Sequence, residues 1–438
     1  MLLIAPHAWQ AQWSEIMPEP ATLALAVHIC PEDELLLCCA RTCVDAATAK
    51  RISRLLRADL DWAYVMRTAL SHGVMPLLYW SLHTTCPAEV PEAFRNALRD
   101  RFYANAGRNL CLTAALLQIL HLLEGHGIPA VPCKGPVLAA AVYGNLALRQ
   151  FSDLDILVHD RDVLKAKDLL ISQGYRPLRR RTSAEEELLL QSRHAYILVR
   201  NDGMFAVDLH WRFADRAFFS PVDLECLWEH LEPVSLAGTT VHHFAPEDLL
   251  LILCVNGSKD SWKQLRTICD IAELIRVHQG MAWERVMEQA STLGSERVLF
   301  LGLLLARDLL GTYLPKEILQ RIQASSVVKS LAAHVHERLF REIEVDGWPA
   351  EVERFVFGLR LRERVRDRVW YCFCYVIPTS ADRALLPWPA GLSFLLCLLR
   401  PIRLTVKYGP PILNYITTLL RISRLKLLKA LQALRQIS

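Results

Sequence analysis

Three aspartates stand in otherwise apolar stretches of this sequence. Asp153 and Asp155 lie in residues 152–158, where the side chains of an extended chain alternate, so a strand would direct both carboxylates to one face. Asp208 lies in a second apolar stretch, residues 204–211. Carboxylates are costly in a core unless they are paired, and their oxygens are ligands that Mg²⁺ prefers. The pattern therefore predicts that Asp153, Asp155 and Asp208 hold two Mg²⁺ ions.

A lysine–glycine turn upstream of these aspartates is suited to holding phosphate. Residues 130–133 read as a short apolar strand, Lys134 and Gly135 turn the chain, and Pro136 is tolerated in a first helical turn because that N–H needs no partner. Residues 137–143 have a helical composition. The start of this helix would direct several N–H groups and the positive end of the helix dipole at one spot. We therefore predict a phosphate site at Gly135.

Carboxylates beside a phosphate site are typical of phosphoryl chemistry on a hydroxyl. In a two-metal site the carboxylates bring a nucleophilic hydroxyl and the α-phosphate of a nucleotide together, while the ions offset charge on the attacking and leaving oxygens. Asp208 would lower the pKa of the acceptor hydroxyl through the metal, or accept its proton. Asp153 could instead cap or pair with Arg149. Lys134 could be a solvated turn lysine, and His210 is more often a satisfied sheet histidine than a catalytic one.

The order of these parts resembles one protein family. The string K-G-x-x-L-A-x-x-x-Y, then Arg149, then D-L-D-I-L-V and V-D-L-H-W, is similar to the bacterial nucleotidyltransferase family often called uncharacterised, a branch of the polymerase-β-like superfamily. The resemblance covers roughly residues 50 to 310. Members commonly lie in gene neighbourhoods for exopolysaccharide or lasso peptide biosynthesis. The glycine–serine pair that is usual in the wider superfamily is replaced here by Lys134-Gly135, as in this branch.

The resemblance implies roles for particular residues. The catalytic residues and metal ligands would be Asp153, Asp155 and Asp208. The residues that contact the nucleotide would include Lys134, Gly135, Arg149 and Ser152, with the lysine and the arginine as cations that face its phosphates.

A helical segment downstream offers further cations. Within residues 247–277, Lys259, Lys263, Arg266 and Asp270 are spaced by four, three and four, which puts them on one helix face if the helix is continuous. In polymerase-β-like enzymes a helical domain after the sheet commonly supplies a cation to the triphosphate, and the pattern W-x-x-L-R-x-x-x-D looks like this family's version. We expect Lys263 or Arg266 to reach the nucleotide and Asp270 to orient it. A solvent-facing row of ion pairs is the alternative.

The elements that position these residues are expected from turns and caps. Residues 195–199 and 204–211 flank Asn201-Asp202-Gly203, which favours a β-hairpin. Helices are expected over residues 93–125 and 160–173. We therefore predict an α+β fold, in which a small mixed β-sheet of polymerase-β-like type is flanked by N- and C-terminal helical domains. The expected domains are an N-terminal helical region (1–105), a nucleotidyltransferase catalytic domain (106–245), a helical nucleotide- or acceptor-binding domain (246–345) and a basic amphipathic helical tail (346–438).

Composition restricts the class of protein. The chain has 438 residues and a net charge of +4, so no global basic field predicts a nucleic acid partner. Its 13 cysteines are scattered. An odd number of cysteines, without framework spacing or a secretory signal, indicates reduced thiols in the cytoplasm.

The C-terminal part of the chain is basic. No aspartate or glutamate follows Asp382, and residues 383–438 contain nine lysines and arginines. The uncharged residues 385–399 are too few to span a bilayer, which needs about 20. A segment on the anionic inner face of a membrane fits this composition, and a helical hairpin packed on the catalytic body or on a partner protein fits equally. Three arginines at 179–181 more often form a solvated loop than a contact to an anionic acceptor.

Together these patterns predict an enzyme that uses Mg²⁺ to transfer a nucleotidyl group from a nucleoside triphosphate to a hydroxyl, with release of pyrophosphate. The acceptor would be a small molecule, a sugar or a ribosomal peptide, and the residues identify neither it nor the base. The alternative is a non-catalytic nucleotide-binding scaffold or partner subunit at the membrane surface. Three like charges on one sheet face argue against a scaffold.

Overall fold

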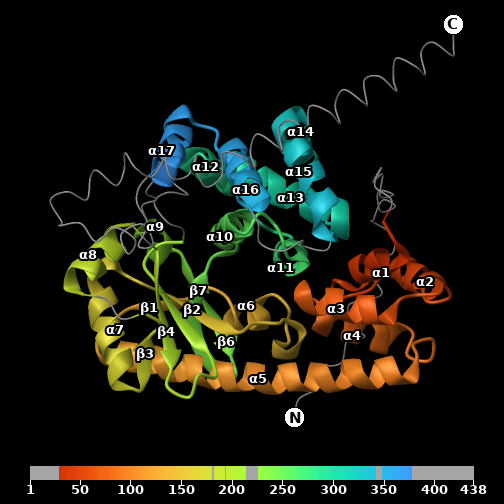
Figure 1. The fold of residues 1–438 in the computed structure, drawn as a ribbon, viewed down its shortest axis with the longest axis horizontal. Helices are drawn as coiled ribbons and strands as arrows, with labels where there is room; N and C mark the ends of the chain where they lie inside the picture. Colours follow the sequence, from red (N-terminus) through yellow and green to blue (C-terminus); the bar gives the residue numbers. More distant parts are fainter. Residues whose placement is uncertain (1–28, 180–181, 193, 214–224, 342–347, 377–438) are drawn as a thin grey trace, which may run out of the picture.

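Five short strands form a mixed sheet at the middle of the chain (Figure 1). The structure, a computed structural model, describes residues 29–179, 182–192, 194–213, 225–341 and 348–376. The strands lie in the order β1 (Ala130–Pro132), β2 (Asp153–Val158), β5 (Ala206–His210), β4 (Ala195–Arg200) and β3 (Tyr175–Pro177). In this sheet β2 and β5 pair in parallel and the other pairs are antiparallel. The predicted small mixed sheet of an α+β fold is confirmed.

The predicted hairpin is present and sets the register of the aspartates. β4 and β5 are joined by residues 201–205, where Gly203 has a φ of 72° that residues with a Cβ adopt less readily. β5 pairs with β2 so that Asp208 lies opposite Asp155. Because side chains alternate along a strand, Asp153 faces the same side of the sheet.

Two helices cover the other face of the sheet. α5 (Glu92–Gly125) has 34 residues and runs along the base of the molecule, and α7 (Val163–Ser172) packs nearby (Figure 1). Apolar residues of the strands, such as Leu154, Ile156 and Leu209, share one core with these helices. Of the described helices, α5 is the one that is long and apolar enough to cross a membrane by length and composition, and 39% of its apolar window is buried inside the protein.

The remaining helices surround a second core that joins both ends of the described chain. They are α1 (Pro31–Cys39), α2 (Ala46–Leu55), α3 (Trp62–Ser71) and α4 (Met75–Thr85), and then α10 (Pro246–Lys259), α11 (Leu265–Val277), α12 (Trp283–Leu293), α13 (Glu296–Leu310), α14 (Lys316–Ala324), α15 (Ser326–Leu339) and α16 (Trp348–Leu361). Shorter or peripheral elements are α6 (Pro136–Ala141), η2 (Leu146–Leu148), η3 (Asp160–Asp162), α8 (Ser183–Ser192), α9 (Glu225–Glu229), the hairpin of β6 (Leu231–Leu236) and β7 (Thr239–Phe244), and α17 (Val365–Val376). Thr42 links the two ends because its N–H and its hydroxyl donate to the carboxylate of Glu273 at 3.0 and 2.6 Å.

Residues 247–277 form two helices, so the condition for one shared face of the cations at 259–266 is not met. α10 ends at Lys259, and α11 begins at Leu265. Lys259 therefore does not share one helix face with Lys263 and Arg266.

The burial of one tryptophan explains this break. Ser261 and Trp262 adopt left-handed φ values of 53° and 56°, which a helix does not allow. The Trp262 ring is 1% exposed and lies against two glycines, where a Cβ at Gly257 or Gly302 would come within 2.5 or 2.9 Å of it. The space left by these glycines lets the ring enter the core, and the chain turns to place it there.

The helical segment at residues 31–49 is also interrupted. α1 ends at Cys39, and α2 begins after Asp45, whose side chain accepts a hydrogen bond from the N–H of Thr48 at 2.7 Å and caps the new helix. The predictions for the tail at 383–438 and for the arginines at 180 and 181 lie outside the described residues.

Candidate active site

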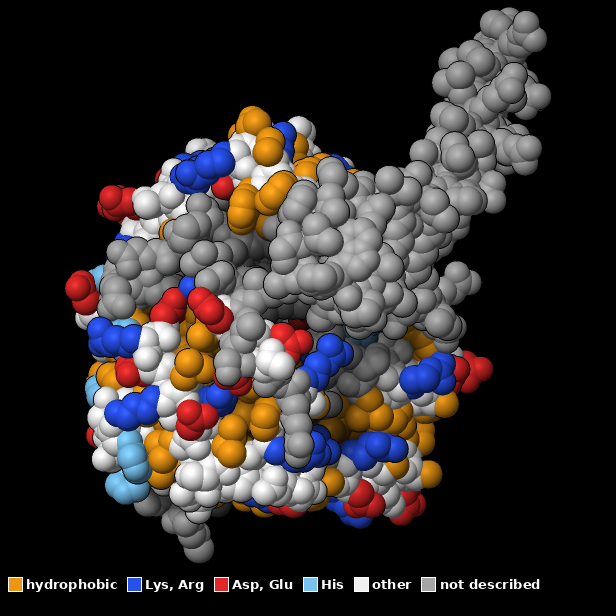
Figure 2. All heavy atoms as spheres, turned by 60° about the vertical axis from the view of Figure 1, so that its left-hand side comes forward, with side chains coloured by type: hydrophobic (Ala, Val, Ile, Leu, Met, Phe, Trp, Pro, Cys, Tyr) orange, Lys and Arg blue, Asp and Glu red, His pale blue; other side chains and the backbone are white. Residues whose placement is uncertain are grey.

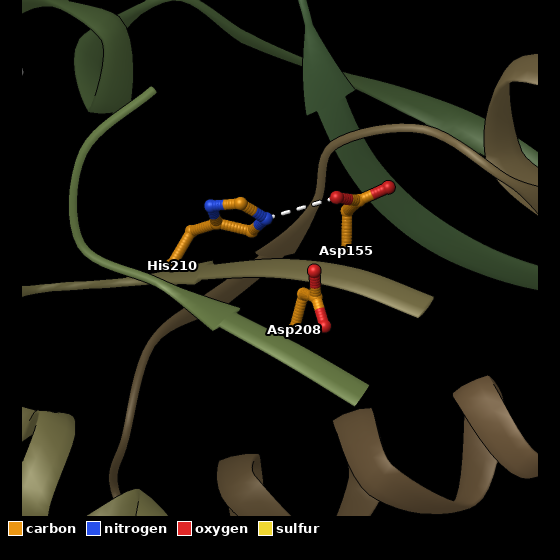
Figure 3. Close-up of side chains that lie close together, drawn as sticks. All are labelled: Asp155, Asp208 and His210. Carbon is orange, nitrogen blue, oxygen red and sulfur yellow. Dashed lines mark hydrogen bonds and ion pairs between the residues drawn. The ribbon is translucent and has the colours of Figure 1, made fainter. Parts of the chain in front are cut away.

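β2 and β5 bring two of the three predicted aspartates together with a histidine (Figure 3). Asp155 lies opposite Asp208, and His210 follows on the same face of β5. One ligand atom of each residue, a carboxylate oxygen or an imidazole nitrogen, lies within 4.8 Å of the other two. Asp153 lies opposite Ala206, is partly exposed and stands outside this group.

Asp155 is held between an imidazole and an ammonium group. Its Oδ1 lies 2.9 Å from His210 Nε2, and its Oδ2 lies 3.5 Å from Lys134 Nζ. Burial would raise the pKa of this carboxyl, but the charge of Lys134 and the hydrogen bond from His210 outweigh burial and hold the pKa well below its usual range. Asp155 is therefore a carboxylate that accepts hydrogen bonds, and the proton of a neutral His210 is assigned to Nε2.

His210 thereby orients Asp155. Burial lowers the pKa of His210, although Asp155 opposes this effect, so the ring is neutral. With Nε2 donating, Nδ1 is left as an acceptor, and it has no hydrogen-bond partner in the described part of the chain. From the sequence, His210 was more readily explained as a satisfied sheet histidine, and the strand pattern contains no signal that it would contact Asp155.

The surroundings of Asp208 disfavour its negative charge and compensate it only in part. Burial, followed by the charges of Asp155 and Asp153, raises the pKa of Asp208 to about 7. Lys134 and Lys259 lower the pKa by smaller amounts. Two facing carboxylates of this kind favour a bound cation.

Two lysines stand beside the carboxylates. Lys134 Nζ donates to Asn256 Oδ1 at 3.2 Å, and Lys259 Nζ donates to a backbone carbonyl oxygen, that of Phe213, at 2.9 Å. Both lysines, with Asn256, His210 and others, line a cavity of about 10 Å³, which is about the space of one water molecule. Lys259 and Asn256 were not among the predicted site residues, because the expected continuous helix placed Lys259 with the cations further along.

The turn predicted to hold phosphate has the expected backbone. Gly135 has a φ of 66° and precedes α6, which begins at Pro136. A Cβ at Gly135 would lie 3.5 Å from the carbonyl oxygen of Asp153, so this turn lies against the start of β2. Ser152 is exposed at the same place. The phosphate contacts of these residues stay predictions.

Arg149 and Asp270, both predicted to serve the nucleotide, contact each other. The guanidinium Nε and Nη2 donate to the two carboxylate oxygens at 2.8 Å each, and the Tyr143 hydroxyl donates to Oδ1 at 2.6 Å. Burial would lower the pKa of Arg149 and raise that of Asp270, but the charge of each partner outweighs burial and keeps both groups ionised. The pair links the loop before β2 to α11. Its geometry is that of a buried structural ion pair.

Of the two remaining predicted cations, Arg266 lies near the Asp153 end of the site. Arg266 donates to the carbonyl oxygen of Gln150 at 2.6 Å and to Gln264 Oε1 at 2.8 Å. Burial lowers the pKa of Arg266, and Asp153 is among the charges that raise it. The hydrogen bonds of Asp270 come from Arg149 and Tyr143, and the charge of Asp270 also raises the pKa of Arg266. The predicted roles of Arg266 and Asp270 at the nucleotide stay predictions. Lys263 is partly exposed.

The donor set fits a divalent cation. Asp155 and Asp208 supply carboxylate oxygens, which are ligands that Mg²⁺ takes, and the two lysines compensate the charge of Asp208 only in part. His210 donates to Asp155 as an outer partner orients a metal-binding carboxylate. These two aspartates would therefore hold the ion, and Asp153 stays predicted as a further ligand.

Comparison with known proteins identifies the family. Residues 58–311, more than half of the chain, match the family described as uncharacterised nucleotidyltransferase. The chain belongs to this family. The resemblance inferred from the motifs is thus confirmed, and every predicted site residue lies inside the matched range.

Two further comparisons accompany the family match. No curated protein matches this chain. Among solved structures, the chain is similar to an antigenic nucleotidyltransferase-like protein from Paracoccidioides brasiliensis, with 13% identity and a TM-score of 0.27, over 49% of this chain and 96% of that chain.

Proposed function

We propose that this protein transfers a nucleotidyl group from a nucleoside triphosphate to a hydroxyl acceptor by a two-Mg²⁺ mechanism. The observation that carries the proposal is the direct register of Asp155 and Asp208, whose oxygens lie within 4.8 Å beside two lysines. Two facing carboxylates are costly in a largely buried site unless a cation joins them. Membership of a nucleotidyltransferase family supports the same chemistry.

In the proposed reaction the oxygen of the acceptor hydroxyl forms a bond to the α-phosphorus. The bond from that phosphorus to the bridging oxygen breaks, and pyrophosphate leaves. The hydroxyl proton passes to a base, for which Asp208 is the candidate on β5. When bound, divalent ions would offset the charge that develops on the attacking and leaving oxygens.

The residues of the chain divide this work. Asp155 and Asp208 hold the ion between β2 and β5, with Asp153 as the predicted ligand of a second ion. His210 fixes the direction of Asp155 before substrate arrives, so less reorganisation is needed during the reaction. Lys134 and Lys259 supply positive charge on the side of Asp155 from which phosphates would be held.

The acceptor is proposed only by class. A small molecule, a sugar or a ribosomal peptide each offers the hydroxyl that the reaction needs. A nucleic acid partner is not proposed, because the net charge of +4 provides no extended basic field. We place the protein in the cytoplasm, consistent with thirteen scattered cysteines.

Calorimetric titration of ATP, GTP, CTP and UTP, with and without Mg²⁺, tests the proposal. Wild type should bind one or more of these nucleotides in a metal-dependent manner, and Asp155→Asn and Asp208→Asn should each weaken this binding at least about tenfold. Asp100→Asn is the matched control, because its side chain is 71% exposed on α5, far along the chain from the site. Metal-independent binding that both site variants retain would overturn the proposed nucleotidyl transfer and favour a non-catalytic nucleotide-binding scaffold.

A further inference from the structure

Helix α17 exposes apolar side chains to solvent. Val365 is 72% exposed, Val369 is 62% exposed and Phe373 is 53% exposed. Because they are spaced by four residues, the three side chains lie along one side of the helix. Figure 2 shows hydrophobic side chains gathered at the top of the molecule, the region in which Figure 1 places α17.

This side of α17 has no acidic residue among the described residues. Successive positions of a helix are about 100° apart, so the other exposed residues of α17, namely Arg366, Trp370 and Cys372, lie around the same side. We call these six residues the outer face of α17. Asp367 is partly buried, and its Oδ1 accepts a hydrogen bond from Arg366 Nε at 3.4 Å. A solvent-facing side of a helix is normally polar, and here it is apolar apart from Arg366, which pairs with Asp367.

The opposite side of α17 is fixed to the rest of the protein. Tyr371 is 5% exposed, stacks on Phe355 with ring centroids 5.4 Å apart, and lies under the guanidinium of Arg362 at 3.5 Å. Arg364, just before α17, donates to the carbonyl oxygens of Ser291 and Thr292 at 2.7 and 2.9 Å. Because these contacts prevent rotation of the helix, its apolar side stays directed outward.

The charge of the adjoining sequence selects the kind of surface that would cover this face. Residues 383–438, a few positions after α17, contain nine basic residues and no acidic one. A second copy of the chain would bring the same cations together, and like charges repel. An anionic lipid surface attracts them and accepts apolar side chains at its headgroup boundary.

We propose that the outer face of α17 docks on an anionic lipid surface. Val365, Val369 and Phe373 enter the headgroup boundary, and the positive charge that the sequence carries over residues 383–438 attracts the chain to the anionic surface. This inference is independent of the proposed nucleotidyl transfer, because it uses no residue of the site.

Cosedimentation of the full chain with lipid vesicles tests the docking. Wild type should bind vesicles of phosphatidylcholine and phosphatidylglycerol at about 3:1, should bind pure phosphatidylcholine vesicles weakly, and should be released by salt. Val369→Asp with Phe373→Asp should lower the partition to anionic vesicles at least about tenfold, because two charged groups replace apolar ones at the boundary. Val369→Leu with Phe373→Leu should retain binding.

A control variant and the thermal unfolding midpoint complete the test. Tyr313→Asp places a new charge at an exposed apolar residue elsewhere, 64% exposed, and should leave binding unchanged. All variants should unfold at the wild-type temperature, since the substituted side chains are exposed. The proposal is overturned if the double Asp variant binds anionic vesicles as well as wild type does, or if wild type does not bind them. It is also overturned if the unfolding midpoint of the double Asp variant falls, or if this variant is monomeric where wild type is a dimer, because either result means that protein covers this face.

Discussion

Removing one partner of the Arg149–Asp270 pair should destabilise the fold rather than act directly on nucleotide binding. The two hydrogen bonds of this pair measure 2.8 Å each, and the side chains are 5% and 4% exposed. In Asp270→Asn the guanidinium stays buried without an opposite charge, and the Tyr143 hydroxyl loses a charged acceptor. Removing one partner of such a pair costs about 3–5 kcal/mol, so the free energy of unfolding should fall by about that amount.

Urea unfolding, followed by tryptophan fluorescence, measures this loss in a double-mutant cycle. Arg149→Met should cost about as much as Asp270→Asn, because it leaves the carboxylate unpaired. The double variant buries no charge, so its loss should be at least about 2 kcal/mol smaller than the sum of the single losses. Arg341→Met is the control, since its pair with Glu337 spans 3.5 Å with side chains 69% and 59% exposed, and its removal should cost less than about 0.5 kcal/mol.

One pattern of results would refute this reasoning. If Arg149 faces phosphate as the sequence predicts, the single variants would keep the wild-type urea midpoint and lose triphosphate affinity in calorimetry. Additive losses in the cycle would also contradict a direct pair. Either outcome would return Arg149 and Asp270 to the nucleotide site.

Three further predictions follow from other contacts. Lys259→Ala should raise the KM for the triphosphate at least about tenfold in a pyrophosphate-release assay, because it removes a charge-assisted contact to phosphate. A larger rise of the KM in Lys263→Ala would contradict the assignment of Lys259 as the lysine that contacts the triphosphate. Gly257→Ala should lower the free energy of unfolding by about 1–3 kcal/mol in urea titrations, because its Cβ would lie 2.5 Å from a buried ring, while Gly107→Ala, which meets open space, should not lower it. Burial lowers the pKa of His243 to about 4. The unfolded chain therefore binds more protons than the folded chain between about pH 6.5 and pH 4, and about 3 kcal/mol of stability, present above pH 6.5, is lost as the pH falls through this window. His243→Asn should flatten the dependence of the free energy of unfolding on pH in this window, and an unchanged pH dependence would exclude His243 as its source.

The catalytic strands could be predicted because they depend on local patterns. The alternation of Asp153, Leu154 and Asp155 specifies a strand with both carboxylates on one face, and the turn at 201–203 specifies the hairpin that carries Asp208. The parallel pairing of β2 with β5 is a contact between distant segments. The turn patterns do not encode this register, so the exclusion of Asp153 from the cluster with His210 was not predictable.

The cation at the end of α10 was missed for a different physical reason. Residues 259–265 contain neither proline nor glycine, so the sequence gives no local signal that a helix ends there. The break depends on the room that Gly257 and Gly302 leave for Trp262, and Gly302 lies on another helix. A helix end that depends on a tertiary contact of this kind is absent from local sequence patterns.

The helical layers determine where the catalytic carboxylates lie. The loop that enters β2 is held at three points: Asn109 on α5 donates to the carbonyl oxygen of Arg149 at 2.8 Å, Asp270 on α11 binds the Arg149 guanidinium, and Arg266 on α11 donates to the carbonyl oxygen of Gln150 at 2.6 Å. Asp153 begins β2 only three residues after Gln150. A shift of α11 relative to α5 would therefore move Asp153 and Asp155 against Asp208, so the geometry of the proposed metal site depends on helices that contribute no ligand to it.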